Sequence, residues 1–384
     1  RRRTAMATIA RIPITNVFMG GAYTARLRVG PGRQPVNVLL DTGSSALALC
    51  GRKYRPSLAD GEEETRLAQS ESYGDGSWWT GAVLKTTVSI GAGASRVVAS
   101  GVSVAVAYGE SPDMFDGCDG ILGLAYEELD DAYLMRGGTW TRQYPTATVA
   151  NGRPRSVVPY LMQLADDDVL AQKVSFLTRR SFIHSGAGLS RDPLNRGWMV
   201  IGGGEEATDL YTGRFQVVKV LTEAWYSTNL KRVIVGGKPP IHVRPRGPKG
   251  MPSNSIVDSG TNSLRLGKSL FRQILSKLTT EQAALLNAAV VDGQAVPMES
   301  LRLASWPTIH VVLEGRETDV TLEVAPGDYW QVNAPRVGRA MAAISIGEDG
   351  FATLGLPLMN GYFTIFDGVA DGGKGVIKFA RARR

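Results

Sequence analysis

Two stretches of the sequence decide the fold: VLLDTGSS at residues 38–45 and SIVDSGT at residues 255–261. Each is a short apolar run that ends in Asp and continues into a small hydroxyl residue and a glycine. A second apolar segment with a glycine follows in each half, GILGL at 120–124 and ATLGL at 352–356. Such a duplication predicts two halves built on one plan, related by a pseudo-twofold axis at which Asp41 and Asp258 meet.

The segments around these motifs mostly have the short apolar runs and period-two alternation of β-strands, and many of the 45 glycines lie between them. We therefore expect a mostly β protein with two lobes, residues 1–200 and 201–384, joined near residues 195–215. Two stretches without periodicity, 55–69 and 130–155, are expected to be surface insertions, and their role stays open. The expected strands include 23–29, 82–90, 97–106, 215–220, 310–313 and 362–366, and the expected helices are 157–165, 271–278 and 280–291.

The composition is that of a globular protein, with 384 residues, 43% of them hydrophobic and 21% charged. This length accommodates two hydrophobic cores. The formal net charge is +7, and the basic residues gather at the two ends and at 242–249. No aromatic-basic repeat or nucleic-acid motif accompanies them, so we expect a solvated basic surface and no nucleic-acid partner.

Cysteine and histidine are rare, with two and three residues respectively. The histidines are far apart in the sequence, so we expect no metal site, and no residue pattern calls for a cofactor. Cys50 and Cys118 could form one bridge or both be free, and we expect neither to be essential for folding. No apolar run reaches 18 residues, which predicts no membrane span.

Paired carboxylates suit the hydrolysis of an amide bond. Two carboxylates held close together cannot easily both ionise, so they share one proton. The ionised member can take a proton from a trapped water, while the protonated member donates to the carbonyl oxygen of the substrate. We therefore predict that Asp41 and Asp258 are the catalytic pair.

The residues that follow each Asp are expected to support this geometry. The glycines let two backbones approach closely. The first hydroxyl after each Asp can hydrogen-bond across the axis, and the second can orient the outer carboxylate oxygen. The supporting residues are thus Thr42, Gly43, Ser44, Ser259, Gly260 and Thr261.

From about residue 12 to residue 379 the chain resembles the pepsin family. YGDGS at residues 73–77 looks like the flap of that family, a hairpin tip that folds over the substrate. The resemblance implies a bilobal acid protease fold with the active-site cleft between the lobes. It also implies that Tyr73 closes on the substrate and that Gly74 belongs to the mobile turn.

Within that family the sequence is most similar to the memapsins, in the segments DGILGLAY at 119–126, LYTG at 210–213 and 256–266. Like memapsins, the chain has an alanine, Ala48, where many pepsins have a flap-bonding Trp. Memapsins use a Trp five residues after the flap Tyr, which implies Trp78, with Trp79 as an insertion. The chain departs from memapsins in having too few cysteines for their three disulfides, and we expect no membrane anchor within residues 1–384.

The resemblance implies a monomeric aspartic endopeptidase that cleaves polypeptides, works best at acidic pH and binds pepstatin-type inhibitors. Phe115 and Ile121 are expected to favour bulky apolar residues before the cut. Arg265 is expected to favour Asp, Glu or Asn two residues before it. The alternative is an inactive family member that only binds protein. A secreted or endomembrane/vacuolar location is favoured, and the low cysteine content leaves the bacterial periplasm or the cytoplasm open.

Overall fold

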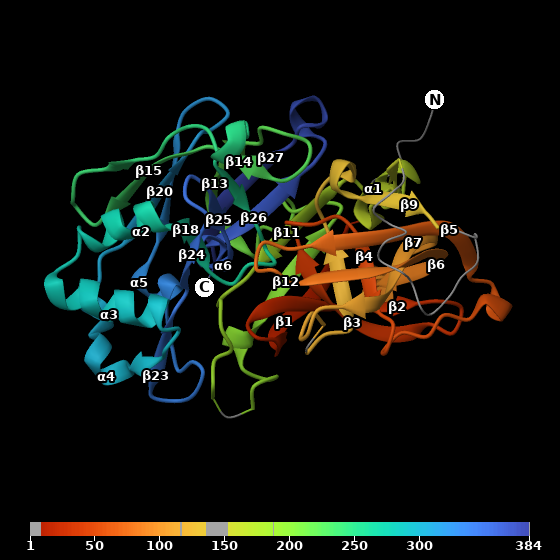
Figure 1. Cartoon of the computed structure of the whole chain (residues 1–384), viewed down its shortest axis with the longest axis horizontal. Helices are drawn as coiled ribbons and strands as arrows, with labels where there is room; N and C mark the ends of the chain where they lie inside the picture. Colours follow the sequence, from red (N-terminus) through yellow and green to blue (C-terminus); the bar gives the residue numbers. More distant parts are fainter. Residues whose placement is uncertain (1–8, 116, 136–152, 187, 384) are drawn as a thin grey trace. The chain divides into compact units, whose positions relative to one another are not determined.

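A computed structural model describes residues 9–115, 117–135, 153–186 and 188–383. The chain divides into two compact units. Unit 1 contains residues 1–12, 24–172 and 200–203, and unit 2 contains residues 13–23, 173–199 and 204–384. Strands dominate both units (Figure 1). The expectation of a mostly β protein is confirmed, while the boundary between the two lobes at residue 200 stays a prediction.

Unit 1 is built around a closed ring of strands, coloured red to yellow in Figure 1. Hydrogen bonds connect β6, β7, β4, β8, β3 and β2 in this order, and β2 pairs back with β6 through residues 27–29. Closure leaves the ring without a free edge. Its elements are β2 (Ala22–Val29), β3 (Gln34–Asp41), β4 (Leu47–Cys50), β6 (Trp78–Ile90), β7 (Val97–Glu110) and β8 (Gly120–Gly123).

Further elements extend this ring. β5 (Glu63–Ser72) pairs with β6, and β9 (Asp131–Leu134) connects β5 to β10 (Arg155–Ser156). The helix α1 (Tyr160–Asp166) contacts β7. β4 and β8 are buried along their whole length, which explains their uniformly apolar and glycine sequences. Buried β8 therefore lies directly beside the strand that ends at Asp41.

Both cysteines are buried in unit 1 and free. Cys50 ends β4, and its Sγ lies 3.7 Å from Oε2 of Glu110. Cys118 precedes β8, and its Sγ contacts the carbonyl oxygen of Gly120 at 3.3 Å. The two thiols thus have different partners, and no bridge joins them.

Unit 2 contains four groups of paired strands, coloured mostly green to blue in Figure 1, of which the first is part of the 15-stranded sheet and the other three are separate sheets. The first holds β11 (Lys173–Leu177), β26 (Tyr362–Asp367), β27 (Val376–Ala382) and β13 (Tyr211–Lys219). The second holds β14 (Ser227–Thr228), β17 (Ser255–Val257), β25 (Ala352–Leu354), β18 (Leu264–Gly267) and β24 (Ile344–Gly347). The third holds β16 (Ile241–His242), β15 (Leu230–Val235), β20 (Ile309–Leu313) and β21 (Val320–Val324), and the fourth holds β19 (Val296–Pro297), β23 (Arg339–Ala342) and β22 (Trp330–Val332). β1 (Ala10–Met19) and β12 (Arg196–Ile201) contribute residues to both units.

Five helices accompany these sheets within the described part of unit 2: α2 (Lys268–Leu275), α3 (Thr280–Val291), α4 (Met298–Leu301), α5 (Pro326–Tyr329) and α6 (Leu356–Met359). The start of α3 is fixed by a capping box, in which Thr279 and Gln282 exchange hydrogen bonds between side chain and backbone. Among the residues described in either unit, no helix is both long and apolar enough to cross a membrane.

The expected elements are found with small shifts at their ends, and α3 spans the predicted residues. One expectation is wrong: residues 63–69, assigned to a surface insertion, belong to β5. This strand hides its alternation because charged side chains occupy most of its first half, while its pairing with β6 holds it in the sheet. The other expected insertion falls largely on residues 136–152, which lie outside the described residues.

Candidate active site

Asp41 is the last residue of β3, held at the end of a parallel strand pair. β3 runs beside β8, with Leu40 opposite Leu122 and Asp41 opposite Gly123. The N–H of Leu124 donates to the carbonyl oxygen of Asp41 at 2.8 Å. The backbone of Asp41 is therefore fixed from the side of β8, as the paired motifs of the first half suggest.

The side chain of Asp41 receives two hydrogen bonds from its own loop. The Gly43 N–H donates to Oδ1 at 2.8 Å, and the Ser44 hydroxyl donates to Oδ2. Asp41 is only 5% exposed. The expected orienting contact of Ser44 is thus confirmed, and the carboxylate is held in one orientation.

Asp258 has the same arrangement in unit 2. It follows β17, which runs parallel to β25, and its N–H donates to the carbonyl oxygen of Leu354 at 3.1 Å. The Gly260 N–H donates to Oδ1 of Asp258 at 2.8 Å, and the Thr261 hydroxyl donates to Oδ2 at 2.6 Å. Asp258 is 7% exposed. The orienting contact of Thr261 is confirmed as well.

The glycine of each later apolar segment is required by close backbone packing. A Cβ on Gly123 would lie 2.3 Å from the carbonyl carbon of Ser45. A Cβ on Gly355 would lie 2.1 Å from the carbonyl oxygen of Thr261. Both glycines therefore let the strand after the Asp loop fold back against the loop, which explains why the sequence repeats them.

Thr42 and Ser259, the first hydroxyl residues after each Asp, are both buried. Their predicted contact across an axis would join the two units, and it stays a prediction. What each unit shows is a carboxylate with one amide donor and one hydroxyl donor.

The segment 73–77 forms the turn of the hairpin between β5 and β6, as expected for a flap. The Tyr73 N–H donates to the carbonyl oxygen of Ser77 at 2.8 Å, and the Gly76 N–H donates to that of Tyr73 at 3.0 Å. Asp75 Oδ1 accepts from the N–H and the hydroxyl of Ser77. Gly76 has φ 91°, a conformation that favours glycine, so the turn needs this residue.

The indole that bonds the flap tyrosine belongs to Trp79, and the expectation of Trp78 is wrong. Trp79 Nε1 donates to the Tyr73 hydroxyl at 3.0 Å. Trp79 is fully buried, whereas Trp78 is 37% exposed. The cause is the register of the hairpin, in which Ser72 lies opposite Trp78 and Glu71 lies opposite Trp79.

This register could have been used before the structure was known. Successive side chains of a strand point to opposite faces, and residues directly opposite each other share a face. A hairpin that pairs Tyr73 with Ser77 therefore places Tyr73 and Trp79 on one face and Trp78 on the other. Counting five residues from Tyr73 leads to Trp78, which lies on the opposite face of the hairpin. The tryptophan on the same face as Tyr73 is one residue further along, at position 79.

Tyr73 connects the flap to the loop of Asp41. Burial, followed by the negative charge of Asp41, raises the pKa of the Tyr73 hydroxyl, and a hydrogen bond with Ser44 acts in the opposite direction. The phenol therefore stays protonated and can donate a hydrogen bond. Trp79, Tyr73, Ser44 and Asp41 form a continuous series of polar contacts from the flap to the carboxylate.

Two carboxyl groups near the flap strands have unusual acidity. Burial, with the charges of Asp130 and Asp131, raises the pKa of Glu71 to about 7. Burial also raises the pKa of Asp130 to about 7, although a hydrogen bond from Gln69 (2.5 Å) opposes the shift. Because Glu71 lies opposite Trp79, this acidic pair adjoins the face that carries Tyr73.

The remaining predicted site residues occupy ordered positions. Phe115 lies between β7 and β8 and is buried, and its carbonyl oxygen accepts from Lys53 Nζ at 3.2 Å. Ile121 lies in β8 between Leu39 and Ala48 and is also buried. The roles of both toward a substrate stay predictions.

Arg265 lies in β18 between Thr353 of β25 and Ser345 of β24. A Cβ on Gly347 would lie 2.9 Å from Cγ of Arg265 and 3.1 Å from its Nε, so the side chain runs along this glycine. Its role in specificity stays a prediction.

The family described as eukaryotic aspartyl protease matches residues 22–137 and 161–380. The matched ranges contain both Asp loops, the hairpin with Tyr73, and the glycines at 123 and 355. The match covers most of the chain, and it agrees with two carboxylates that have the same set of donors. The chain therefore belongs to the eukaryotic aspartyl protease family, the pepsin family.

Proposed function

We propose that this protein is an aspartic endopeptidase in which Asp41 and Asp258 activate one water for attack on a peptide bond. Membership of the family implies an aspartic peptidase in general. The observation that supports the proposal is the matched pair of loops: each Asp accepts one amide and one hydroxyl hydrogen bond at the same two oxygens. Such matched loops suit two carboxylates that act on one reacting centre.

The chemistry is that established for aspartic proteases. Two adjacent carboxylates share one proton, because the ionisation of one opposes that of the other. One carboxylate takes a proton from the water, and the other donates its proton to the oxygen of the scissile carbonyl. The substrate class is polypeptide, and pepstatin-type inhibitors are expected to bind.

Tyr73 is proposed to close over the substrate on the flap. Its hydroxyl is held by Trp79 and linked to Ser44, so closure of the hairpin would act on the loop that holds Asp41. The glycines at 74 and 76 suit a turn that moves.

The test uses a quenched fluorescent peptide library at acidic pH, with and without a pepstatin-type inhibitor. Asp41→Asn and Asp258→Asn should each lower kcat/KM by at least about a thousandfold, while circular dichroism remains that of the wild type. Asp167→Asn and Asp292→Asn, one exposed Asp in each unit, serve as matched controls and should retain activity. Near wild-type activity in either dyad variant would refute the assignment.

The dependence of the rate on pH separates this function from other acid–base pairs. A shared proton predicts a bell-shaped profile of kcat/KM with its maximum below neutrality. A rate that keeps rising to about pH 8 would contradict a carboxylate pair. Wild-type protein that binds the inhibitor but cleaves no peptide at any pH would instead identify an inactive, protein-binding member of the family.

A further inference from the structure

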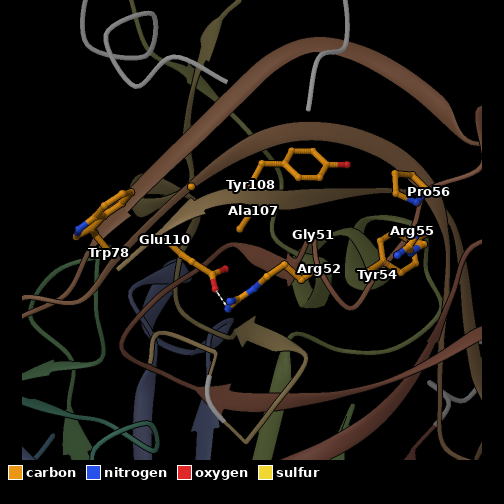
Figure 2. A pocket seen from close by; sticks show the side chains of 10 residues that line it. Gly51, Arg52, Tyr54, Arg55, Pro56, Trp78, Ala107, Tyr108 and Glu110 are labelled. Atoms are coloured by element: carbon orange, nitrogen blue, oxygen red, sulfur yellow. Dashed lines mark hydrogen bonds and ion pairs between the residues drawn. The ribbon is translucent and has the colours of Figure 1, made fainter. Parts of the chain in front are cut away.

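Unit 1 contains a pocket of about 600 Å³ that lies outside the loop of Asp41. Figure 2 shows it between Trp78 at one end and Pro56 at the other. Neither Asp41 nor the residues that hydrogen-bond its carboxylate line this pocket. The proposed peptidase chemistry does not use it.

Small residues form the base of the pocket. β4 ends at Cys50, opposite Ala107, whereas β7 continues to Glu110. The Gly51 N–H donates to the carbonyl oxygen of Ala107 at 2.7 Å, and a Cβ on Gly51 would lie 2.5 Å from the ring of Tyr108. Because β7 extends past the end of β4, a groove runs along its last residues.

Aromatic side chains form the walls. Trp78 is exposed, and its backbone is fixed by Ser111, whose hydroxyl accepts from the Trp78 N–H at 3.0 Å and whose N–H donates to the Trp78 carbonyl at 2.8 Å. Tyr54 and Tyr108 line the opposite part of the groove (Figure 2). Rigid aromatic walls of this kind bury the apolar part of a ligand at low entropic cost.

The charge in the pocket is positive. Arg52 forms an ion pair with Glu110, and the Arg52 side chain is 75% exposed. Arg55 also lines the pocket, and its backbone N–H bonds to Gln34 at 3.5 Å. Within the described residues its guanidinium forms no ion pair or hydrogen bond. The pocket lining thus carries two guanidinium groups and one carboxylate, and Arg55 lies at the Pro56 end, away from the Arg52–Glu110 pair (Figure 2), which leaves a net positive charge for a further anion.

We propose that this pocket binds an acidic segment of a polypeptide, with separate ligand carboxylates on Arg55 and on Arg52 and the ligand's apolar atoms against Trp78 and Tyr108. A guanidinium binds a carboxylate through two parallel hydrogen bonds, which gives selectivity for this group. An extended segment fits a groove that follows the end of a strand. Because Trp78 lies in the flap strand next to Trp79, the bound segment would also contact the stem of the flap.

The binding test does not depend on turnover. The full-length Asp41→Asn protein is titrated by calorimetry with the peptide acetyl-Glu-Glu-Phe-Glu-Glu-amide. The same peptide with Gln for every Glu, and with Lys for every Glu, provides the comparison. We expect the acidic peptide to bind at least about tenfold more tightly than either. Absence of saturable binding of the acidic peptide, or tighter binding of the Lys peptide, would overturn the proposal.

Three variants locate the site. Arg55→Gln should weaken binding of the acidic peptide about three- to tenfold, and Glu110→Gln should tighten it, because one removes a cation and the other an opposing anion. Arg28→Gln, a matched loss of charge at an exposed position of β2 outside the pocket, should leave binding unchanged. Equal effects of Arg55→Gln and Arg28→Gln would show non-specific attraction and refute the site. Peptide binding without any peptidase activity of the wild type would refute the proposed function alone.

Discussion

Asp41 and Asp258 lie in loops of the same design, yet the two loops have different neighbours. In both, a glycine N–H and a hydroxyl three residues after the Asp hold the carboxylate. In unit 1 the hydroxyl belongs to Ser44, which connects to Tyr73 of the hairpin. In unit 2 it belongs to Thr261, and the next hydroxyl, that of Ser263, bonds to Ser345 at 2.7 Å within the sheet.

The difference shows that the motif determines the geometry of the carboxylate, whereas the surrounding unit determines which residues the loop contacts. The local geometry of a carboxylate follows from a short motif and the glycine that lets the chain fold back. The residues that contact each loop come from other segments of its unit, the hairpin with Tyr73 in unit 1 and β24 in unit 2. The loop of Asp41 is joined to the tip of the hairpin between β5 and β6, and the residues after Thr261 bond to a strand of a sheet.

The strongest test of the equivalence replaces the packed glycines. Gly123→Ala and Gly355→Ala should each lower the free energy of unfolding by at least about 2–3 kcal/mol, because the new methyl group would overlap the loop backbone. Unfolding in urea, followed by circular dichroism, measures this. Gly32→Ala and Gly237→Ala have open space around the new Cβ and should change stability by less than about 1 kcal/mol. A large loss at only one of the two packed glycines would break the equivalence.

The second largest expected effect is a loss of activity when the hydrogen bond between Tyr73 and Trp79 in unit 1 is removed. Trp79→Phe and Tyr73→Phe should each reduce kcat/KM about tenfold, because each removes one side of the same hydrogen bond. Together they should cost no more than either alone, which is the signature of coupled residues.

Trp78, the neighbouring tryptophan, is the control for this double-mutant experiment. Trp78→Phe combined with Tyr73→Phe should give additive losses, since Trp78 points to the other face of the hairpin. Additive losses for Trp79 with Tyr73, together with non-additive losses for Trp78 with Tyr73, would reverse the assignment of the two indoles.

The smallest expected effect is a dependence of stability on pH that arises beside the flap. The pKa of Glu71 is raised from its ordinary value of 4.5 to about 7, so the folded protein retains this proton to higher pH than the unfolded chain does. Stability therefore falls as pH rises from about 4.5 to about 7. Glu71→Gln should remove the penalty and be more stable than the wild type above pH 7, by on the order of 1–2 kcal/mol, with the gain vanishing in acid.

Thermal unfolding from acid to neutral pH would follow this gain. Glu63→Gln changes the same charge at an exposed position of the same strand and is the matched control. A gain of the Glu71 variant that grows toward acidic pH would have the wrong sign and would exclude a buried, uncompensated carboxylate.

Much of the fold was predictable because the sequence repeats its key segments. The two Asp motifs predicted a strand that ends at each Asp and an orienting hydroxyl after it, and the structure has both; the parallel pairing of these strands with the later glycine segments was not predicted. α3 was predictable because it is rich in Ala and Leu, which favour helices, and because Thr279 caps its first turn. How the two carboxylates are arranged relative to each other stays a prediction.

The errors arose where the neighbouring strand determines the structure. β5 carries Glu63, Glu64 and Arg66 in its exposed half, so its own sequence shows no clear alternation, and its state depends on β6. Trp78 and Trp79 have the same chemistry, and only the register of the hairpin decides which one turns inward. Both features are long-range or pairwise, and a count along one strand does not contain them.

The two buried thiols of unit 1 make the strands around Asp41 accessible to chemical measurement. Burial raises the pKa of Cys118 to about 11, so its sulfur is held as the slowly reacting thiol. An alkylating reagent can reach Cys118, beside β8, or Cys50, in β4, only when these segments open. The labelling rates of Cys50 and Cys118 would therefore report how often the segments around β4 and β8 open, without any engineered probe.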